Sequence, residues 1–249
     1  MRREKEDMKR CFIVGAGDFY GGFSPSENDL VIAADGGLLH LLQRGIKPDV
    51  VIGDFDSLNY KAFAVLLDKF LENEEESHTR VKKITKISSK SECIQAMKDT
   101  FEFCEIISHP IEKDETDMYL AYEIGKKKEC TIFYLYGGVG GREDHTFANY
   151  CLLLKAKNDK NQAFLIGNNT KSFVIENEKV EICGIAGNHV SVFAFGTKAE
   201  GVFIKGLKYE ADDVTLTTDF PLGVSNSFDE SKKAEISVAR GALLIMVEE

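Results

Sequence analysis

Leu30-Val-Ile-Ala-Ala-Asp-Gly-Gly37 and Val50-Val-Ile-Gly-Asp-Phe-Asp-Ser57 are the two stretches of sequence that decide the fold. Each begins with a short apolar run and ends at an acidic turn. Residues 38–44 and 59–71 follow them with apolar side chains at helical spacing. A short apolar run bounded by turn residues indicates a buried strand. Two strands that each lead into a helix therefore predict βαβ units.

The same alternation continues over the first two thirds of the chain. Strands that alternate with helices are typical of an α/β domain with a mostly parallel sheet. The sequence predicts further strands at 11–15, 105–108, 131–136 and 163–166, and further helices at 116–127 and 144–157.

Beyond about residue 171 the pattern changes to short β-rich runs separated by turn residues. Regular short strands of this kind predict a smaller antiparallel β-sandwich or barrel. We therefore expect two domains, residues 1–168 and 169–249. Residues 72–100 fit neither pattern because they are polar and highly charged, and we expect a solvated insertion or a mobile loop there.

Composition excludes several classes of protein. The formal net charge of -10 argues against a general nucleic-acid binder, which normally carries a basic face. The six cysteines form no CxxC pair and no zinc-site spacing, so buried reduced thiols are expected. The charged N-terminus lacks the apolar core of a signal peptide, and no apolar run approaches the roughly 18 residues that span a bilayer. We expect a cytoplasmic protein with no nucleic-acid or membrane partner.

Four acidic motifs lie where predicted strands end or helices begin. In open α/β sheets, ligands bind in the crevice at the carboxyl ends of the strands. Asp54 and Asp56 are two apart in extended chain and can point the same way, and two such carboxylates repel each other unless a cation lies between them. Hard oxygen ligands of this kind suit Mg²⁺. The motifs are Ala34-Asp-Gly-Gly37, Gly53-Asp-Phe-Asp-Ser57, Lys113-Asp-Glu-Thr-Asp117 and Gly137-Gly-Val-Gly-Gly-Arg-Glu-Asp-His145.

The fourth motif also suits phosphate binding. A glycine-rich turn that leads into a helix lets backbone N–H groups approach phosphate oxygens, and Arg142 can add a bidentate contact. His145 can contact a nucleotide, orient Asp144 or cap the helix, and the sequence leaves these three roles open. Each motif alone also fits turn and capping chemistry, since Thr116 and Asp144 are good N-cap residues.

Three other nucleotide-site patterns are excluded or disfavoured. Gly15-Ala-Gly-Asp-Phe-Tyr-Gly21 differs by one position from a dinucleotide fingerprint, and Pro25 follows before any clear helix. The chain contains no GxxxxGK[ST] phosphate loop. The Asp54-Phe-Asp56 pair resembles the phosphoaspartyl phosphatase signature, but it follows the third predicted strand instead of the first.

Together the motifs resemble the thiamin pyrophosphokinase family, over residues 11 to 247. The four acidic motifs carry the resemblance with Gly45-Ile-Lys-Pro-Asp49, Gly206-Leu-Lys-Tyr209 and Ser225-Asn226. The resemblance implies a doubly wound catalytic domain, a C-terminal β domain that binds thiamin, and a homodimer with the active site between subunits. The stretch from Asn59 to Pro110 is longer than the family usually needs.

The resemblance also implies roles for individual residues. Asp54, Asp56 and Asp117 would be magnesium ligands and, with Arg142, the catalytic group. Phe228 is a guess for the aromatic residue near the thiamin ring. The nucleotide and substrate sites would include Asp35, Gly36, Gly37, Lys113, Thr116, Arg142, Asp144, His145, Ser225 and Asn226.

The implied reaction is pyrophosphoryl transfer. The thiamin hydroxyl attacks the β-phosphorus of ATP, and AMP leaves; positioning and charge neutralisation dominate such reactions. The sequence leaves open which carboxylate accepts the hydroxyl proton. Two rival readings use the same site: a metal-dependent nucleotide phosphohydrolase and a non-catalytic thiamin or nucleotide sensor. A purely structural protein would leave the acidic cluster without a purpose.

Overall fold

The computed structural model describes residues 9–55, 58–73, 87–108, 114–230 and 232–249. The chain forms two compact units, Met1–Asn149 and Tyr150–Glu249. The predicted boundary at 168/169 falls inside the second unit and stays a prediction.

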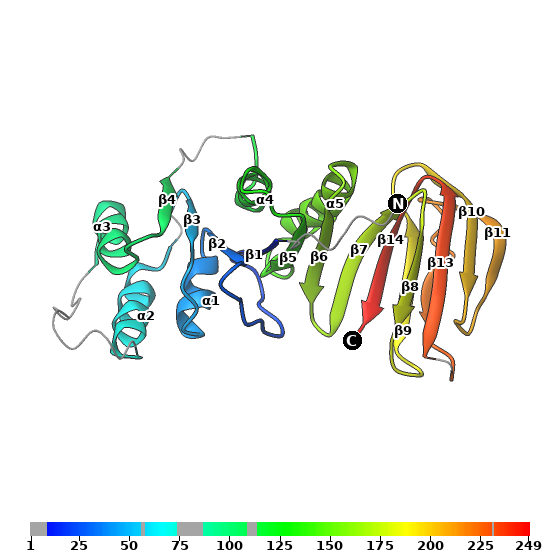
Figure 1. The fold of residues 1–249 in the computed structure, drawn as a ribbon, viewed down its shortest axis with the longest axis horizontal. Helices are drawn as coiled ribbons and strands as arrows, with labels where there is room; N and C mark the ends of the chain where they lie inside the picture. The colour runs from blue at the N-terminus through cyan, green and yellow to red at the C-terminus, as the bar shows by residue number, and fades with distance from the viewer. Residues whose placement is uncertain (1–8, 56–57, 74–86, 109–113, 231) are drawn as a thin grey trace. The chain divides into compact units, whose positions relative to one another are not determined.

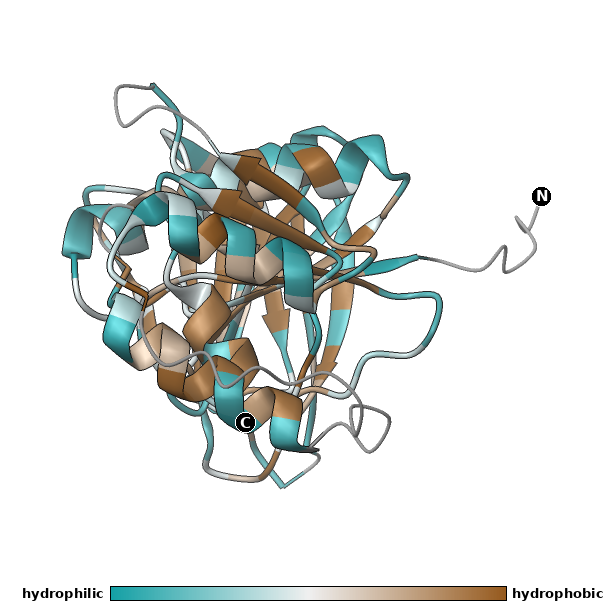
Figure 2. Ribbon diagram, turned by 90° about the vertical axis from the view of Figure 1, so that its left-hand side faces the viewer, coloured by the Kyte–Doolittle hydropathy of each residue, from teal (hydrophilic) through white to brown (hydrophobic). Residues whose placement is uncertain are grey.

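Five parallel strands form the sheet of the first unit, in the order β5-β1-β2-β3-β4 (Figure 1). β1, β2 and β3 are buried almost throughout, as expected for strands covered on both faces. Figure 2 shows them as brown ribbons flanked by helices with teal outer turns. The predicted parallel sheet is confirmed. The strands are β1 (Arg10–Val14), β2 (Leu30–Ala34), β3 (Val50–Gly53), β4 (Glu105–Ser108) and β5 (Ile132–Tyr136).

Helices cover both faces of this sheet, so the doubly wound arrangement is confirmed. Figure 1 shows α1 and α2 on one side of the strands and α4 on the other. α1 packs on β1 and β2, and α4 packs on β1, β2 and β3. The helices are α1 (Gly37–Gln43), α2 (Tyr60–Asn73), α3 (Lys90–Thr100), α4 (Asp117–Lys127) and α5 (Glu143–Asn158).

The strand order contains a topological switch point between β1 and β5. From β1 the chain adds β2, β3 and β4 on one side, and then crosses back to place β5 on the other side. The loops that leave β1 and β5 lie side by side at this point, where the N–H of Gly17 donates to the carbonyl of Gly137. Ligands of open α/β sheets bind in the crevice that forms at such a point.

The expectation of a loop over residues 72–100 is wrong for residues 90–100, which form α3. Ser89 caps this helix by accepting a hydrogen bond from the backbone N–H of Glu92 (3.3 Å). Cys93 and Met97 face the core, whereas most of the other side chains are polar. α2 extends to Asn73, and residues 74–86 lie outside the described part of the chain.

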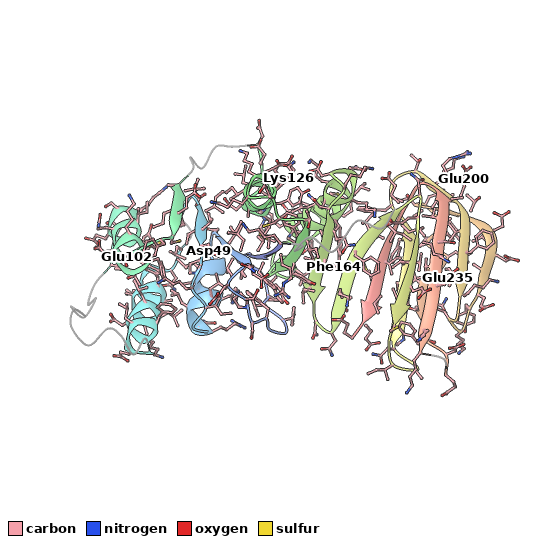
Figure 3. All side chains as sticks on the ribbon, in the orientation of Figure 1. Asp49, Glu102, Lys126, Phe164, Glu200 and Glu235 are labelled. Carbon is pink, nitrogen blue, oxygen red and sulfur yellow. The ribbon has the colours of Figure 1, made fainter. Side chains whose placement is uncertain are left out.

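The second unit is an antiparallel β-sandwich, as predicted. One sheet has the order β12-β9-β14-β7-β6 and the other β11-β10-β13-β8. Alternate residues of both sheets meet in one apolar core, whereas Glu200 and Glu235 lie on the outer face (Figure 3). The strands are β6 (Gln162–Gly167), β7 (Thr170–Glu176), β8 (Lys179–Cys183), β9 (His189–Ala194), β10 (Lys198–Lys205), β11 (Ala211–Thr217), β12 (Gly223–Ser227), β13 (Lys233–Arg240) and β14 (Ala242–Glu248).

Within the described residues, none of the helices combines the length and the apolar character needed to cross a membrane.

Candidate active site

Asp35 and Asp54 follow neighbouring strands at the same edge of the sheet. Asp35 has a positive φ of 50° and donates its backbone N–H to the carbonyl of Ile52 (2.7 Å). This bond holds the turn after β2 against the end of β3, two residues before Asp54. Phe55, fully buried with a φ of 57°, anchors the turn on the other side of Asp54. Two of the predicted acidic positions therefore share one short stretch of sheet edge.

Gly36 and Gly37 bring the start of α1 close to β1. A Cβ atom on Gly37 would lie 1.8 Å from the carbonyl oxygen of Val14, so only glycine fits there. A Cβ atom on Gly36 would lie 2.9 Å from that of Ala16. Both glycines were singled out from the sequence. In the structure they allow the backbone at the start of α1 to approach the end of β1 closely.

Asp117 is the first residue of α4, where the sequence expected a helix to begin. Thr116 caps this helix, because its hydroxyl accepts a hydrogen bond from the N–H of Tyr119 (3.2 Å). The side chain of Met118 lies against Gly15, where an added Cβ atom would be 2.8 Å from its sulfur. The start of α4 therefore adjoins the end of β1.

The predicted metal site is only partly covered by the described residues. Asp56 and Lys113 lie outside the described residues. Among the described residues, no three His, Cys, Asp or Glu side chains gather closely enough to hold a metal ion. Asp54 and Asp117 provide oxygen donors at one sheet edge, and Mg²⁺ commonly uses one or two carboxylates with phosphate oxygens and water. This donor set suits Mg²⁺.

The loops after β1 and β5 are joined by backbone hydrogen bonds at the switch point. Gly17 donates to the carbonyl of Gly137 and Asp18 to that of Val139, both at 2.8 Å. The carboxylate of Asp18 abuts Gly140, since a Cβ atom there would lie 2.2 Å from Asp18 Oδ2. Sequence reasoning missed Asp18, although it belongs to the Gly15–Gly21 stretch that was set aside as a failed dinucleotide fingerprint.

Arg142 and Asp144 form an exposed ion pair at the start of α5. The guanidinium donates from Nε (3.1 Å) and Nη2 (2.5 Å) to the two carboxylate oxygens. The hydrogen bond with Arg142 is the main cause that lowers the pKa of Asp144. The backbone N–H of His145 also donates to Asp144 Oδ1 (3.0 Å). The imidazole of His145 is exposed, and the three roles that the sequence allows for it stay predictions.

An aromatic loop between β1 and β2 covers the switch point from one side. His40 of α1 contacts the carbonyl of Gly17 through Nε2 (2.9 Å), and its ring packs near Phe19. The guanidinium of Arg44 lies 3.6 Å from the centre of the Phe19 ring. Burial is the main cause that lowers the pKa of His40, with a smaller contribution from the charge of Arg44. Sequence reasoning did not single out His40, because it lies inside the helix that follows the Ala34-Asp-Gly-Gly37 motif and reads as part of the helical pattern.

Ser225 occupies a β-bulge in the second unit. Gly223 pairs with Val192 and Asn226 with Val190, so β12 carries one more residue than β9 over this interval. Ser225 has a φ of 59° and is exposed. Bulges often turn a side chain at the edge of a sheet toward a functional site. The predicted substrate residue therefore occupies a locally irregular, outward-facing position.

Asn226 is buried next to this bulge and binds backbone. Its Oδ1 accepts hydrogen bonds from the N–H groups of Tyr209 and Ser227 (2.9 Å each), and its Nδ2 donates to the carbonyl of Tyr209 (2.6 Å). Asn226 thereby fixes Tyr209, which is 61% exposed. Phe228 is 3% exposed and packs in the core, so the guess that it lies against a ligand ring is wrong.

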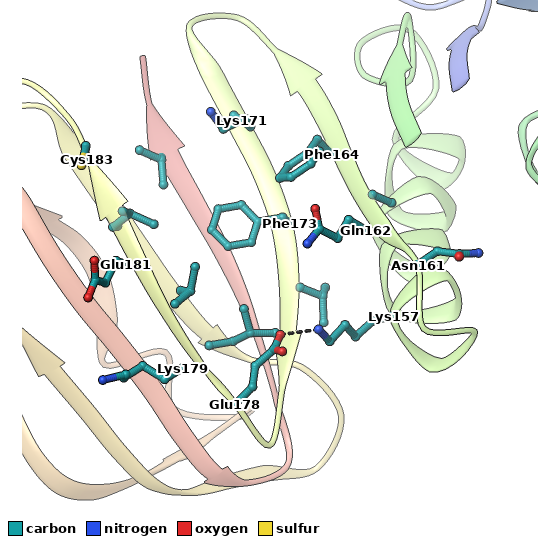
Figure 4. Close-up of a pocket in the computed structure, with 16 residues that line it drawn as sticks. Lys157, Asn161, Gln162, Phe164, Lys171, Phe173, Glu178, Lys179, Glu181 and Cys183 are labelled. Carbon is teal, nitrogen blue, oxygen red and sulfur yellow. Dashed lines mark hydrogen bonds and ion pairs between the residues drawn. The ribbon is translucent and has the colours of Figure 1, made fainter. Parts of the chain in front are cut away.

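A cavity of the second unit lies elsewhere. It measures about 540 Å³ and lies between β6, β7 and β8, over the Phe164–Phe173 pair (Figure 4). Lys157 pairs with Glu178, and Lys179 pairs with Glu235 (2.9 Å). None of the predicted site residues lines it, and its cations are neutralised by neighbouring carboxylates.

Comparisons with known proteins agree with these features. Residues 25–165 match the family model "Thiamin pyrophosphokinase, catalytic domain", and residues 173–243 match "Thiamin pyrophosphokinase, vitamin B1 binding domain". The thiamine pyrophosphokinase of Bacillus subtilis (strain 168) is 26% identical over 221 residues, which are 88% of this chain and 87% of that protein.

Solved structures show the same fold. A crystal structure of thiamine pyrophosphokinase from Bacillus subtilis has a TM-score of 0.75 at 22% identity, covering 96% of this chain and 98% of that one. Thiamin pyrophosphokinase from Candida albicans has a TM-score of 0.63 at 15% identity, covering 96% and 89%.

A doubly wound unit with acidic and glycine-rich loops at its carboxyl edge, followed by a β-sandwich, is a two-unit α/β protein, and its match to a pyrophosphokinase catalytic domain places it among the transferases. Both family models match in the expected order and together cover most of the chain. The chain belongs to the thiamin pyrophosphokinase family, which confirms the predicted resemblance.

Proposed function

We propose that this chain is a magnesium-dependent thiamin pyrophosphokinase, which transfers the pyrophosphoryl group of ATP to the hydroxyl of thiamin. The main observation behind this proposal is that four parts of the chain lie at one edge of the sheet. They are the acidic turns after β2 and β3, the start of α4 and the glycine-rich loop after β5. Such an edge suits a polyphosphate with its cations. Family membership supports the choice of thiamin as the acceptor.

Asp54, Asp56 and Asp117 would hold Mg²⁺, which neutralises negative charge on the polyphosphate when bound. The ion pair between Arg142 and Asp144 is exposed, so the guanidinium is accessible from solvent. Arg142 would release Asp144 and bind a phosphate oxygen instead. The thiamin oxygen then forms a bond to the β-phosphorus, the bond to the α-phosphate oxygen breaks, and AMP leaves. One carboxylate of the acidic group accepts the hydroxyl proton.

The nucleotide would lie along the turns that leave β2 and β5. Asp35 would accept hydrogen bonds from it, and the close approach of the backbone at Gly36 and Gly37 would leave room beside the strand ends. Thr116 supports the site by capping α4. The remaining proposed nucleotide residues are Lys113, Asp144 and His145.

Thiamin would bind at the bulge of β12. Ser225 faces outward, and Asn226 supports the site by fixing the backbone of Tyr209. The exposed ring of Tyr209 suits stacking against a flat, cationic heterocycle. We propose Tyr209 for the aromatic position at which Phe228 fails.

The active unit would be a homodimer with the active site between subunits. Phe220 and Leu222, just before the bulge, are 65% and 63% exposed in the single chain, although they are large and apolar. Neighbouring exposed apolar side chains commonly mark an interaction surface. The domain boundary at 168/169 also remains a proposal; it lies between the segments that the two family models match. The cytoplasmic location remains a prediction.

A single incubation of the purified protein with thiamin, ATP and Mg²⁺, followed by separation of the nucleotides, tests the function. AMP and thiamin diphosphate should form in equal amounts, and only when thiamin and metal are both present. ADP or free phosphate without thiamin diphosphate would instead indicate a phosphohydrolase. Binding of thiamin and ATP without any turnover would indicate a sensor.

A further inference from the structure

Asn149 is a buried amide within the otherwise apolar inner face of α5. It is 4% exposed, and Leu152, Leu153 and Ala156 on the same helix are also buried. Its Nδ2 donates a hydrogen bond of 2.7 Å to the carbonyl oxygen of Gly138. Burying an amide is unfavourable unless its hydrogen bonds are satisfied. The hydrogen bond to the glycine-rich loop therefore offsets the cost of burying Asn149.

Three consecutive carbonyl groups of that loop are held by the protein. The carbonyl of Gly137 accepts from Gly17 and that of Val139 from Asp18, each at 2.8 Å, while Asn149 holds the carbonyl between them. Asn149 is the only side chain of the three donors, because the other two are backbone N–H groups. The loop after β5 is therefore fixed from both the β1 side and the α5 side.

These three hydrogen bonds fix the orientation of the carbonyl groups of Gly137, Gly138 and Val139. Gly140 and Gly141 have positive φ values of 77° and 64°, which allows successive N–H groups to form a concave anion-binding turn. Within the described residues, the N–H groups of these two glycines donate to no backbone carbonyl, and the carboxylate of Asp18 lies beside Gly140. A carbonyl that rotated toward the ligand would instead repel a phosphate oxygen.

We infer that Asn149 is a positioning residue for ATP: its bond to Gly138 keeps the loop from Gly137 to Gly141 in the conformation that binds the polyphosphate. The inference rests on the proposed function, because it assigns the loop to that substrate. Asn149 itself touches neither substrate nor metal. Its removal should therefore weaken nucleotide binding and leave thiamin binding unchanged.

Asn149→Leu removes the donor and keeps a side chain of similar size. We expect the KM for ATP to rise about 10- to 100-fold, as a misplaced binding group typically costs, with the KM for thiamin within about twofold of wild type. Calorimetric titration with a non-hydrolysable ATP analogue and Mg²⁺ should show the same loss in the absence of chemistry. Asn161→Leu is the matched control, because Asn161 is also buried, at 8%, but lies beyond the end of α5.

The two KM values decide the inference. An unchanged KM for ATP in folded Asn149→Leu, or an equal rise for thiamin and ATP, would overturn it. Should this variant fail to fold, Asn149→Ser keeps a small polar group that is too short to reach Gly138, and the same selective loss is expected. A wild-type protein that binds the analogue but forms no AMP would contradict the proposed function, while the binding data would still decide the role of Asn149.

Discussion

Asp54 is the residue whose charge the proposed reaction uses most directly. Asp54→Asn keeps the size of the side chain and removes one negative charge from the sheet edge. We expect turnover to fall by about 10²- to 10³-fold, because charge neutralisation at the polyphosphate is the main catalytic contribution. The rate of AMP formation at saturating substrates measures this loss. Asp99→Asn on exposed α3 is the charge-matched control and should retain wild-type turnover.

Near wild-type turnover in Asp54→Asn would remove this residue from the catalytic group. Circular dichroism and the thermal midpoint must accompany the assay, since a lower rate counts only in a folded protein.

His40 gives the stability of the first unit a pH dependence. Burial lowers its pKa, and the nearby charge of Arg44 contributes in the same direction. The unfolded chain takes up a proton near pH 6.5, whereas the folded chain does so only at lower pH. Its full contribution to stability is therefore present above pH 6.5 and is lost as the pH falls toward the folded pKa.

His40→Gln removes this titration and keeps an amide that can donate to the carbonyl of Gly17. We expect the thermal midpoint of the wild type to decrease more between pH 7.5 and about pH 5.5 than that of the variant. Parallel curves of midpoint against pH for the two proteins would show that His40 is not the titrating group.

Individual site residues were predictable where a local motif contains them. Asp35, Asp54 and Asp117 lie at strand ends and helix starts, where a short pattern and one rule about parallel sheets are enough. Asn149 was not singled out, and Tyr209 was named within the Gly206-Leu-Lys-Tyr209 motif without a role, because their roles depend on partners 11 and 17 residues away. Such pairings are set by how the loops fold back, which local periodicity does not encode.

At the scale of elements, the N-terminal cap of α3 is a simple test of local stability. The hydroxyl of Ser89 accepts a hydrogen bond from the backbone N–H of Glu92. The carboxylate of Glu92 accepts in turn from the N–H of Ser88 (2.7 Å). Ser89→Ala should lower the free energy of unfolding by about 1 kcal/mol, the usual effect of losing an N-cap. Chemical denaturation measures it.

Lys98→Ala is the control for this change, because Lys98 is exposed in the same helix and lies far from the N-terminal cap. A loss in Lys98→Ala equal to that in Ser89→Ala would mean that the cap itself contributes nothing.

The same helix shows why some elements escaped prediction. α3 presents only Cys93 and Met97 to the core, so its apolar stripe is too narrow to stand out in a charged segment. The Ser89-Lys-Ser-Glu92 capping box was the available signal. β8 and β12 carry weak sequence signals for a related reason. β8 alternates charged and apolar residues over only five positions, and β12 is Gly-Val-Ser-Asn-Ser with a bulge.

At the scale of the whole molecule, the pattern of apolar runs predicted the type of sheet but not the order of its strands. Continuous apolar runs such as Leu30–Ala34 and Val50–Gly53 identify strands buried on both faces, and hence a parallel sheet. The position of β5 beside β1 depends on a crossover that no local pattern specifies. The switch point, on which the proposed site depends, therefore became visible only in the structure.

The homodimer is the remaining whole-molecule proposal, and it concerns the surface around the bulge of β12. We expect the wild type to have twice the chain mass of 27.8 kDa in light scattering. The double variant Phe220→Ser, Leu222→Ser should shift this mass toward the monomer and raise the KM for thiamin, because the proposed thiamin site lies between subunits. Both side chains are exposed in the single chain, so the fold should survive. Phe103→Ser, 88% exposed in the first unit, is the matched control and should remain dimeric. A double variant that stays dimeric would show that this apolar surface is not the subunit interface, and a monomer with unchanged thiamin kinetics would show that each chain holds a complete site.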